Sequence, residues 1–189
     1  MRPRTRFGAA ESQQRGRTSG STRQKVRSAT DGSDNVKLHL GELTITSPDF
    51  VHSGPLPRYA TADGEHASPA LRWSSVPPGT RSFALVSTDP DAPLTHGFDH
   101  WVLYNIPAGT IELAKSASGV GTTGPNGVGL AEWCPASPPP GHGTHTYYFH
   151  LYALDCEPDL PEGLSRSLLL DAIDEHILEQ ARISGTFGR

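Results

Sequence analysis

Two aspartates and two histidines stand in two blocks that could form one polar site. The segment STDPDAPLTHGFDHWVLYNIP places Asp89 and Asp91 after one apolar run and His100 at the start of the next. A second segment, PPPGHGTHTYYFHLYALD, places His145 at the start of an aromatic run. A carboxylate beside an imidazole favours the imidazolium form and orients the ring, so such a histidine could act as a hydrogen-bond donor. The aspartates could instead accept hydrogen bonds from loop amides and hold the rim of a site in shape.

Catalysis is an alternative interpretation of these residues. An acid–base hydrolase could use Asp and His, and a metal-dependent hydrolase could use Asp89, His100 and His145 as ligands. The sequence contains neither a GxSxG elbow nor an HExxH motif, and the three ligands come from distant segments. Cys134 has no neighbouring base and no CxxC spacing. We therefore expect no catalytic residue, no metal and no cofactor, and we predict that the protein is not an enzyme.

Short apolar runs bounded by Pro, Gly and Asp predict the strands that would position these side chains. In VKLHLGELTIT, Leu and Ile alternate with polar residues, and a phase slip at Gly41–Glu42 predicts a bulge. Further strands are predicted at 70–73, 82–88, 100–106 and 145–154. Several short strands joined by long irregular connections predict an antiparallel β-sandwich.

One helix and one long loop complete the predicted domain. In SRSLLLDAIDEHILEQARI, the apolar residues recur every four positions, which predicts a helix that caps the sandwich through Leu169, Ile173, Ile177 and Ala181. Residues 115–144 are rich in Gly and Pro and predict a long loop, without the Lys-Ser or Lys-Thr of a phosphate-binding P-loop. The aromatic residues of the strands, including Tyr147, are interpreted as core.

Charge divides the chain of 189 residues into a tail and one domain. Residues 1–35 hold eight basic and three acidic residues, a net charge of +5, whereas residues 36–189 hold eight basic and seventeen acidic residues, a net charge of −9. The tail lacks apolar periodicity, so it cannot bury enough surface to offset the entropy of ordering, and we predict that it is disordered. It could form an arm for nucleic acid or acidic membranes, but we favour a solvated extension and predict no nucleic-acid partner.

The start of the chain has no apolar core of a secretory signal, and no run of about 18 apolar residues is present to span a bilayer. We therefore predict no stable membrane insertion and a cytoplasmic location. In that compartment Cys134 and Cys156 would both be reduced.

Four blocks in order resemble the signature of the phosphatidylethanolamine-binding protein family, in its bacterial Raf-kinase-inhibitor-like branch. The resemblance runs from about residue 37 to the end of the sequence, including the last helix and GTFGR. It implies an antiparallel β-sandwich with a small pocket at one end that binds phosphoryl groups, phosphate or similar anions. The blocks are DPDAP at 89–93, HWVLYNIP at 100–107, PPPGHGTH at 138–145 and YYFHLYALD at 147–155.

Carried over by position, the family pocket would consist of Asp89, Asp91, Pro93, His100 and His145. The prolines fix φ along the rim and so reduce the entropy lost on binding. The resemblance implies a small phosphorylated or anionic ligand and a regulatory role. Relatives also suggest an alternative, inhibition of a protein kinase or a protease through a protein surface, and a homodimer as a possible state.

Three features depart from the family pattern. Thr146 follows His145 where the family usually has an arginine that helps to orient the carboxylates, and Phe187 stands where a tyrosine is common. The family run Gly-Pro-Cys-Pro-Pro is replaced by AEWCPASPPPGHG, which adds Trp133. These departures concern the ligand and leave the implied fold unchanged.

Overall fold

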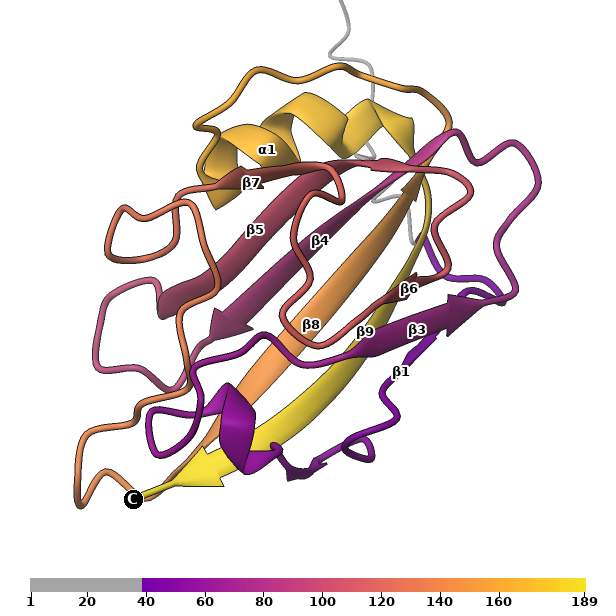
Figure 1. Cartoon of the computed structure of the whole chain (residues 1–189). Coiled ribbons are helices and arrows are strands. Elements are labelled where there is room, and N and C mark those ends of the chain that lie inside the picture. Colours follow the sequence, from indigo (N-terminus) through magenta and orange to yellow (C-terminus); the bar gives the residue numbers. More distant parts are fainter. Residues whose placement is uncertain (1–38) are drawn as a thin grey trace, which may run out of the picture. The chain divides into compact units, whose positions relative to one another are not determined.

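The structure, a computed structural model, describes residues 39–189. The predicted disordered tail, residues 1–35, lies outside the described residues. Within residues 39–189 there are nine strands, one α-helix and two 3-10 helices (Figure 1). In chain order these are β1 (Thr44–Thr46), β2 (Gly54–Pro55), η1 (Arg58–Ala60), β3 (Leu71–Ser74), β4 (Ser82–Asp89), β5 (Phe98–Pro107), β6 (Glu112–Leu113), β7 (Thr122–Gly124), β8 (Thr144–Leu154), α1 (Arg166–Ile173), η2 (Asp174–His176) and β9 (Ile177–Gly188).

The strands form two sheets. One has three strands in the order β1-β3-β6, and the other has six in the order β2-β9-β8-β4-β5-β7. All paired strands run antiparallel except β2 and β9, which are parallel. The longest pairing joins β8 to β9, from Thr144 opposite Gly188 to Leu154 opposite Ile177. The predicted fold class, mostly β with two sheets and a helix late in the chain, is confirmed.

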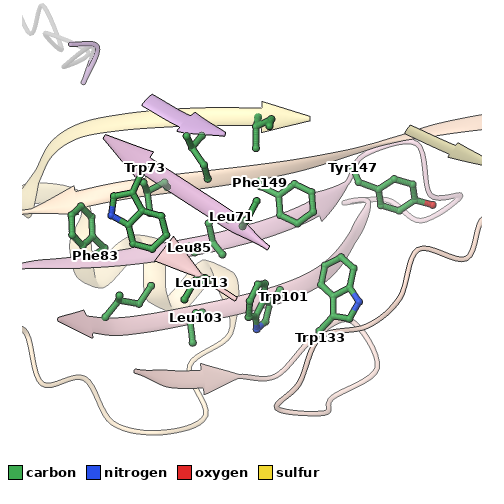
Figure 2. Packing of buried hydrophobic residues seen from close by; sticks show 14 of the residues in the cluster. Leu71, Trp73, Phe83, Leu85, Trp101, Leu103, Leu113, Trp133, Tyr147 and Phe149 are labelled. Carbon is green, nitrogen blue, oxygen red and sulfur yellow. The ribbon is translucent and has the colours of Figure 1, made fainter. Parts of the chain in front are cut away.

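The main core lies between the two sheets (Figure 2). Alternation along β8 sends Tyr147, Phe149 and Leu151 into this core, where they join Leu71 and Trp73 of β3. The intervening β8 residues face the other side of the sheet. There Tyr152 and Leu154 pack with Leu169 and Ile173 of α1 in a second, smaller core. The six-stranded sheet is therefore buried on one face by the other sheet and partly on the opposite face by α1.

The predicted C-terminal helix is wrong in its second half. Ser165 caps α1, its side chain accepting a hydrogen bond from the amide of Leu168, and the helix ends at Ile173. Ile177 and Ala181 belong to β9 instead. The ladder to β8 supplies backbone hydrogen bonds along the whole of β9, and this tertiary pairing outweighs a local four-residue spacing. None of the described helices is long and apolar enough to cross a bilayer.

The predicted first strand is also shorter than expected. It spans only Thr44–Thr46, and the predicted bulge at Gly41–Glu42 is wrong because both residues precede it. Leu43 donates its amide to Oε2 of Glu179 on β9, 2.9 Å away, so a side chain replaces the expected ladder there. Leu40, with 72% of its surface exposed, contributes little to the core. The predicted loop at 115–144 is interrupted by β7, which pairs with β5.

Candidate functional site

The strand order brings one end of β4 beside the starts of β5 and β8. Because β4 is antiparallel to both neighbours, its last residue, Asp89, lies opposite Phe98 of β5, and Thr88 lies opposite Tyr148 of β8. The structure therefore brings Asp89, His100 and His145 together at this end of the six-stranded sheet.

A β-bulge turns His100 toward the site. Ser87 pairs with Trp101, but the next residue, Thr88, pairs with Asp99, so His100 is an extra residue on β5. Without the bulge, strict alternation would place His100 on the same face as Val102, which packs toward α1. The bulge allows both Trp101 and His100 to lie on the inner side, while Asp99 stays on the outer face and pairs with Arg166.

Asp89 and His145 form a buried pair. Nδ1 of His145 lies 2.8 Å from Oδ2 of Asp89, and the two side chains are only 3% and 5% exposed. The other carboxylate oxygen, Oδ1, accepts hydrogen bonds from the amides of Asp91 at 2.9 Å and Ala92 at 3.1 Å. Asp89 thus satisfies both roles considered for the acids, because it orients the histidine ring and also fixes the loop after β4.

Asp91 fixes the rim from the other side. Its Oδ2 accepts a hydrogen bond from the backbone amide of Thr146 at 2.8 Å. In this chain a backbone donor therefore contacts the carboxylate at the position where the family pattern has an arginine. Asp91 is exposed and does not line the cavity, so its contact ties the loop after β4 to the start of β8.

His100 is held as a neutral ring, which corrects the expectation of two imidazolium groups. Its Nδ1–H donates to the carbonyl of Cys134 at 2.7 Å, and only 4% of the residue is exposed. Burial lowers the pKa of His100, and this effect outweighs the opposing influences of the Cys134 carbonyl and of Asp89. Tyr147 packs edge-on against the ring at 5.1 Å and Phe98 packs at 4.8 Å, so the ring cannot turn freely.

A cavity of about 360 Å³ opens between these groups and the surrounding loops. His100, His145 and Asp89 contribute its polar wall. Apolar and proline side chains form most of the remainder, including the predicted rim residue Pro93. The other lining residues are Ala92, Leu94, Phe98, Cys134, Pro135, Ser137, Pro138 and Pro139. A cavity of this size suits a small ligand with one polar end.

Arg189 supports the wall of the cavity, a role that the sequence analysis did not predict. Arg189 donates from Nε and Nη2 to Oδ1 of Asp63, at 3.1 and 2.8 Å, and from Nη1 to the hydroxyl of Ser137 at 3.3 Å. Since Ser137 lines the cavity, Arg189 joins the proline-rich loop to the loop around Asp63. Neither residue lies in one of the four family blocks, although Arg189 ends the GTFGR motif and Ser137 lies in the proline-rich run that departs from the family pattern.

Tyr147 is the second residue whose setting the sequence did not reveal. It lies in the core as predicted, but its hydroxyl is buried without a hydrogen-bond partner in the described part of the chain. In Figure 2 the hydroxyl points away from the rest of the apolar cluster. The two-residue spacing from His145 could have indicated this setting, because residues two apart on one strand share a face of the sheet.

The two thiols are poor nucleophiles. Burial, with a contribution from Glu132, raises the pKa of Cys134, and burial together with Asp155 raises the pKa of Cys156. Both cysteines are free, and a thiol that stays protonated reacts slowly.

The fold and the pocket define a class of protein, a two-sheet β domain with a small histidine- and aspartate-lined cavity at one end of its larger sheet. The family model for phosphatidylethanolamine-binding protein matches residues 46–188. The chain therefore belongs to the phosphatidylethanolamine-binding protein family.

Relatives and a solved structure agree with this assignment. A UPF0098 protein of Aquifex aeolicus is 38% identical over 154 residues, covering 78% of this chain and 89% of the relative. The UPF0098 protein YbhB of Escherichia coli is 38% identical over 133 residues, covering 66% of this chain and 84% of YbhB. The crystal structure of E. coli YbcL, described as a member of the mammalian PEBP family, has a TM-score of 0.74 and 30% identity, covering 79% of this chain and 99% of YbcL. The predicted family and its YbhB/YbcL branch are confirmed.

Proposed function

We propose that the cavity at Asp89, His100 and His145 binds a small, singly charged phosphoryl-type anion that carries a P–OH group, and that the protein acts by binding. The observation that supports this most directly is the hydrogen bonding of the two rings. Each ring uses Nδ1 for a protein partner, Asp89 for His145 and the Cys134 carbonyl for His100. Nε2 of each ring is then the nitrogen that can meet a ligand.

The two Nε2 atoms differ in their hydrogen-bonding roles, so they require different ligand atoms. A carbonyl can only accept, so Nδ1 of His100 carries its proton, and the Nε2 of this neutral ring is an acceptor. When His145 is doubly protonated, its Nδ1–H donates to the Asp89 carboxylate and its Nε2–H donates to the ligand. A phosphoryl group with one P–OH and an anionic oxygen offers both the donor and the acceptor.

The charges favour a singly charged ligand. A protonated His145 is balanced by Asp89, and His100 is neutral because burial lowers its pKa. The guanidinium of Arg189, which contacts the lining residue Ser137, is already paired with Asp63. A doubly charged anion would therefore enter a mostly apolar cavity with little compensation, which is costly.

Calorimetric titration tests the assignment with three probes, inorganic phosphate, the monoester phosphoethanolamine and the diester glycerophosphoethanolamine. The first two should bind, and more tightly near pH 6 than near pH 8. The complex requires the P–OH proton of the ligand, and the free ligand loses that proton as the pH rises. The diester lacks a P–OH and should bind more weakly, since it leaves Nε2 of His100 without a donor. Equal affinity for the diester would refute the donor–acceptor assignment, and no binding of any probe would refute the proposed function.

Variants separate the pocket from the rest of the surface. His145→Ala should weaken phosphate binding by about 1.5 to 3 kcal/mol, the value of a hydrogen bond to a charged group. His145→Gln is a second variant, because its side-chain amide can still donate to Asp89 and so preserve the fold. Circular dichroism shows whether each variant is folded. His96→Ala changes an exposed histidine that does not line the cavity and should leave affinity unchanged.

Three other expectations stay predictions. Inhibition of a kinase or protease would need a protein-binding surface, and a homodimer would need an interface. The third is the cytoplasmic location.

The hydrogen bonds at the site bear on the hydrolase alternatives. Both carboxylate oxygens of Asp89 accept hydrogen bonds from protein donors, and Nδ1 of each histidine contacts a protein partner. Among Asp89, His100 and His145, this leaves one unbonded imidazole nitrogen on each histidine and no unbonded carboxylate oxygen, which favours binding over hydrolysis.

A further inference from the structure

A second cluster of polar side chains lies at the other end of β8. Asp155 follows the last residue of β8, and His176 precedes the first residue of β9. Because Leu154 pairs with Ile177, the two residues are adjacent at the point where the chain leaves the sheet and returns to it. The amide of Asp155 donates to the carbonyl of His176 at 3.0 Å, and Nδ1 of His176 lies 2.9 Å from Oδ1 of Asp155.

Cys156 adds a sulfur to this pair. One ligand atom each from Asp155, Cys156 and His176 lie within 4.8 Å of one another. The backbone at Cys156 is held in place, since its carbonyl accepts a hydrogen bond from the hydroxyl of Ser82 at 2.6 Å. The three donors therefore stand on the fixed ends of two paired strands and on one residue anchored to a third.

We propose that Asp155, Cys156 and His176 form a binding site for one Zn²⁺ ion, with water as the fourth ligand. A tetrahedral zinc ion with an O, N and S ligand set separates its donors by about 3.3 to 3.6 Å, from metal–ligand lengths of about 2.0 to 2.3 Å. The 2.9 Å contact between Asp155 and His176 must widen slightly, and the Cys156 sulfur already lies within 4.8 Å of both donor atoms. Asp155 and His176 have side chains 49% and 46% exposed, so this adjustment meets little packing.

The donor chemistry selects the metal. A thiolate with an imidazole favours Zn²⁺ over Mg²⁺ and Ca²⁺, which prefer oxygen ligands. One carboxylate and one thiolate would exactly offset the two charges of the ion. The surroundings add further negative charge from Glu157, although Arg81 lies 3.6 Å from that carboxylate.

The position of the site gives it a structural role. Residues 155–176 form an excursion from the sheet that carries α1, and in the metal-free chain its neck is closed by the Asp155–His176 contact. A metal ion at the neck would close this loop more firmly, because it binds the folded arrangement and not the open chain. Zinc should therefore stabilise the packing of α1 on the sheet.

Titration of the metal-free full chain with Co²⁺ and Zn²⁺ tests the site. Co²⁺ should form a one-to-one complex with a thiolate-to-cobalt charge-transfer absorption, which histidine and carboxylate ligands do not produce. The chain has two cysteines, so the absorption can be assigned by substitution. Cys134→Ser is the matched control, because Cys134 lines the cavity at the opposite end of β8.

Cys156→Ser should abolish the absorption and weaken Zn²⁺ binding by at least about tenfold, and His176→Asn should weaken it by a similar factor. Cys134→Ser should retain the absorption and an affinity within about twofold of the parent chain. Zn²⁺ should raise the Tm of the parent chain and of Cys134→Ser, but not of Cys156→Ser. No charge-transfer absorption in the parent chain, its survival in Cys156→Ser or its loss in Cys134→Ser would each overturn the proposal.

Discussion

The Nδ1 atom of His145 lies 2.8 Å from the Oδ2 atom of Asp89, although 56 positions separate the two residues in the chain. Both side chains are buried, and each stands on a strand of the same sheet, at places fixed by the pairing of β4 with β8. The orientation of the histidine is therefore set by the fold before any ligand arrives, which lowers the cost of ordering the site on binding.

Asp89→Asn should weaken phosphate binding by at least about tenfold near pH 6. The new side chain can still accept hydrogen bonds from the amides of Asp91 and Ala92, but it no longer balances a protonated His145. The free energy of unfolding should fall by about 1 to 3 kcal/mol, since a buried charged contact is lost. Calorimetry and urea unfolding measure the two effects.

Asp99→Asn is the control for this change. Asp99 lies on the outer face of β5, paired with Arg166 at 3.3 Å, and does not line the cavity. Its substitution should leave phosphate affinity unchanged. If both variants weaken binding equally, the effect comes from net charge and not from the Asp89–His145 pair.

His150 should make the protein less stable in acid. Burial, assisted by Arg182 and Arg166, lowers the pKa of His150 to about 4. The unfolded chain, with a histidine pKa of about 6.5, then binds more protons than the folded chain, so stability is lost as the pH falls from about 6.5 toward 4. After allowance for partial exposure, the contribution is on the order of 1 to 3 kcal/mol.

His150→Gln should reduce this loss, measured as the difference in unfolding free energy between pH 7 and pH 4.5. Part of the loss should remain, because burial also lowers the pKa of His100. His142→Gln, at an exposed loop position, should change the pH dependence little. An identical pH profile for His150→Gln and the parent chain would contradict the prediction.

Gly97→Ala should strongly destabilise the turn between β4 and β5. Gly97 has a φ of 68°, and an added Cβ would lie 2.6 Å from the carbonyl oxygen of Asp89. Gly141 has a φ of 82° but open space around its Cβ position. Gly141→Ala should cost about 1 kcal/mol from backbone strain alone, and Gly97→Ala at least about 2 kcal/mol. Equal losses in thermal unfolding would show that the turn can shift to accept a Cβ.

Tyr147→Phe should leave the free energy of unfolding unchanged or raise it by up to about 1 kcal/mol. The hydroxyl is buried without a partner in the described residues, and burial raises its pKa, so it stays protonated. Tyr104→Phe is the comparison, because the Tyr104 hydroxyl donates to the carbonyl of Pro161 at 2.8 Å. That variant should lose about 1 kcal/mol. A comparable loss in Tyr147→Phe would indicate a hydrogen-bond partner for its hydroxyl.

Residue type and order were enough to predict three strands of the larger sheet, and the family resemblance pointed to the residues that meet at its end. The runs at 82–88, 100–106 and 145–154 correspond to β4, β5 and β8 with small shifts at their ends. Their apolar alternation indicates which side chains are buried on one face of a sheet, and this burial stabilises the fold.

The second half of the predicted helix, the state of His100 and the role of Arg189 depend on contacts between distant segments, which local sequence patterns do not contain. The four-residue spacing through Ile177 and Ala181 fits a helix equally well, and only the pairing with β8 selects a strand. The neutral state of His100 follows from its burial and its contact with the Cys134 carbonyl, neither of which can be read from the sequence. Arg189 reaches the cavity wall through Asp63 and Ser137, two segments far from it in the chain.

The β-bulge at His100 separates two functions of β5 that usually compete within one strand, packing of the core and lining of the cavity. From Trp101 to Tyr104, the alternation of β5 serves packing on both faces of the sheet, whereas Phe98 and His100 serve the cavity. Substitutions on the cavity side of the bulge can therefore change what is bound while the pairing that holds the sheet together is preserved. For protein engineering, this makes Phe98 and His100 natural places to alter ligand preference without redesigning the core.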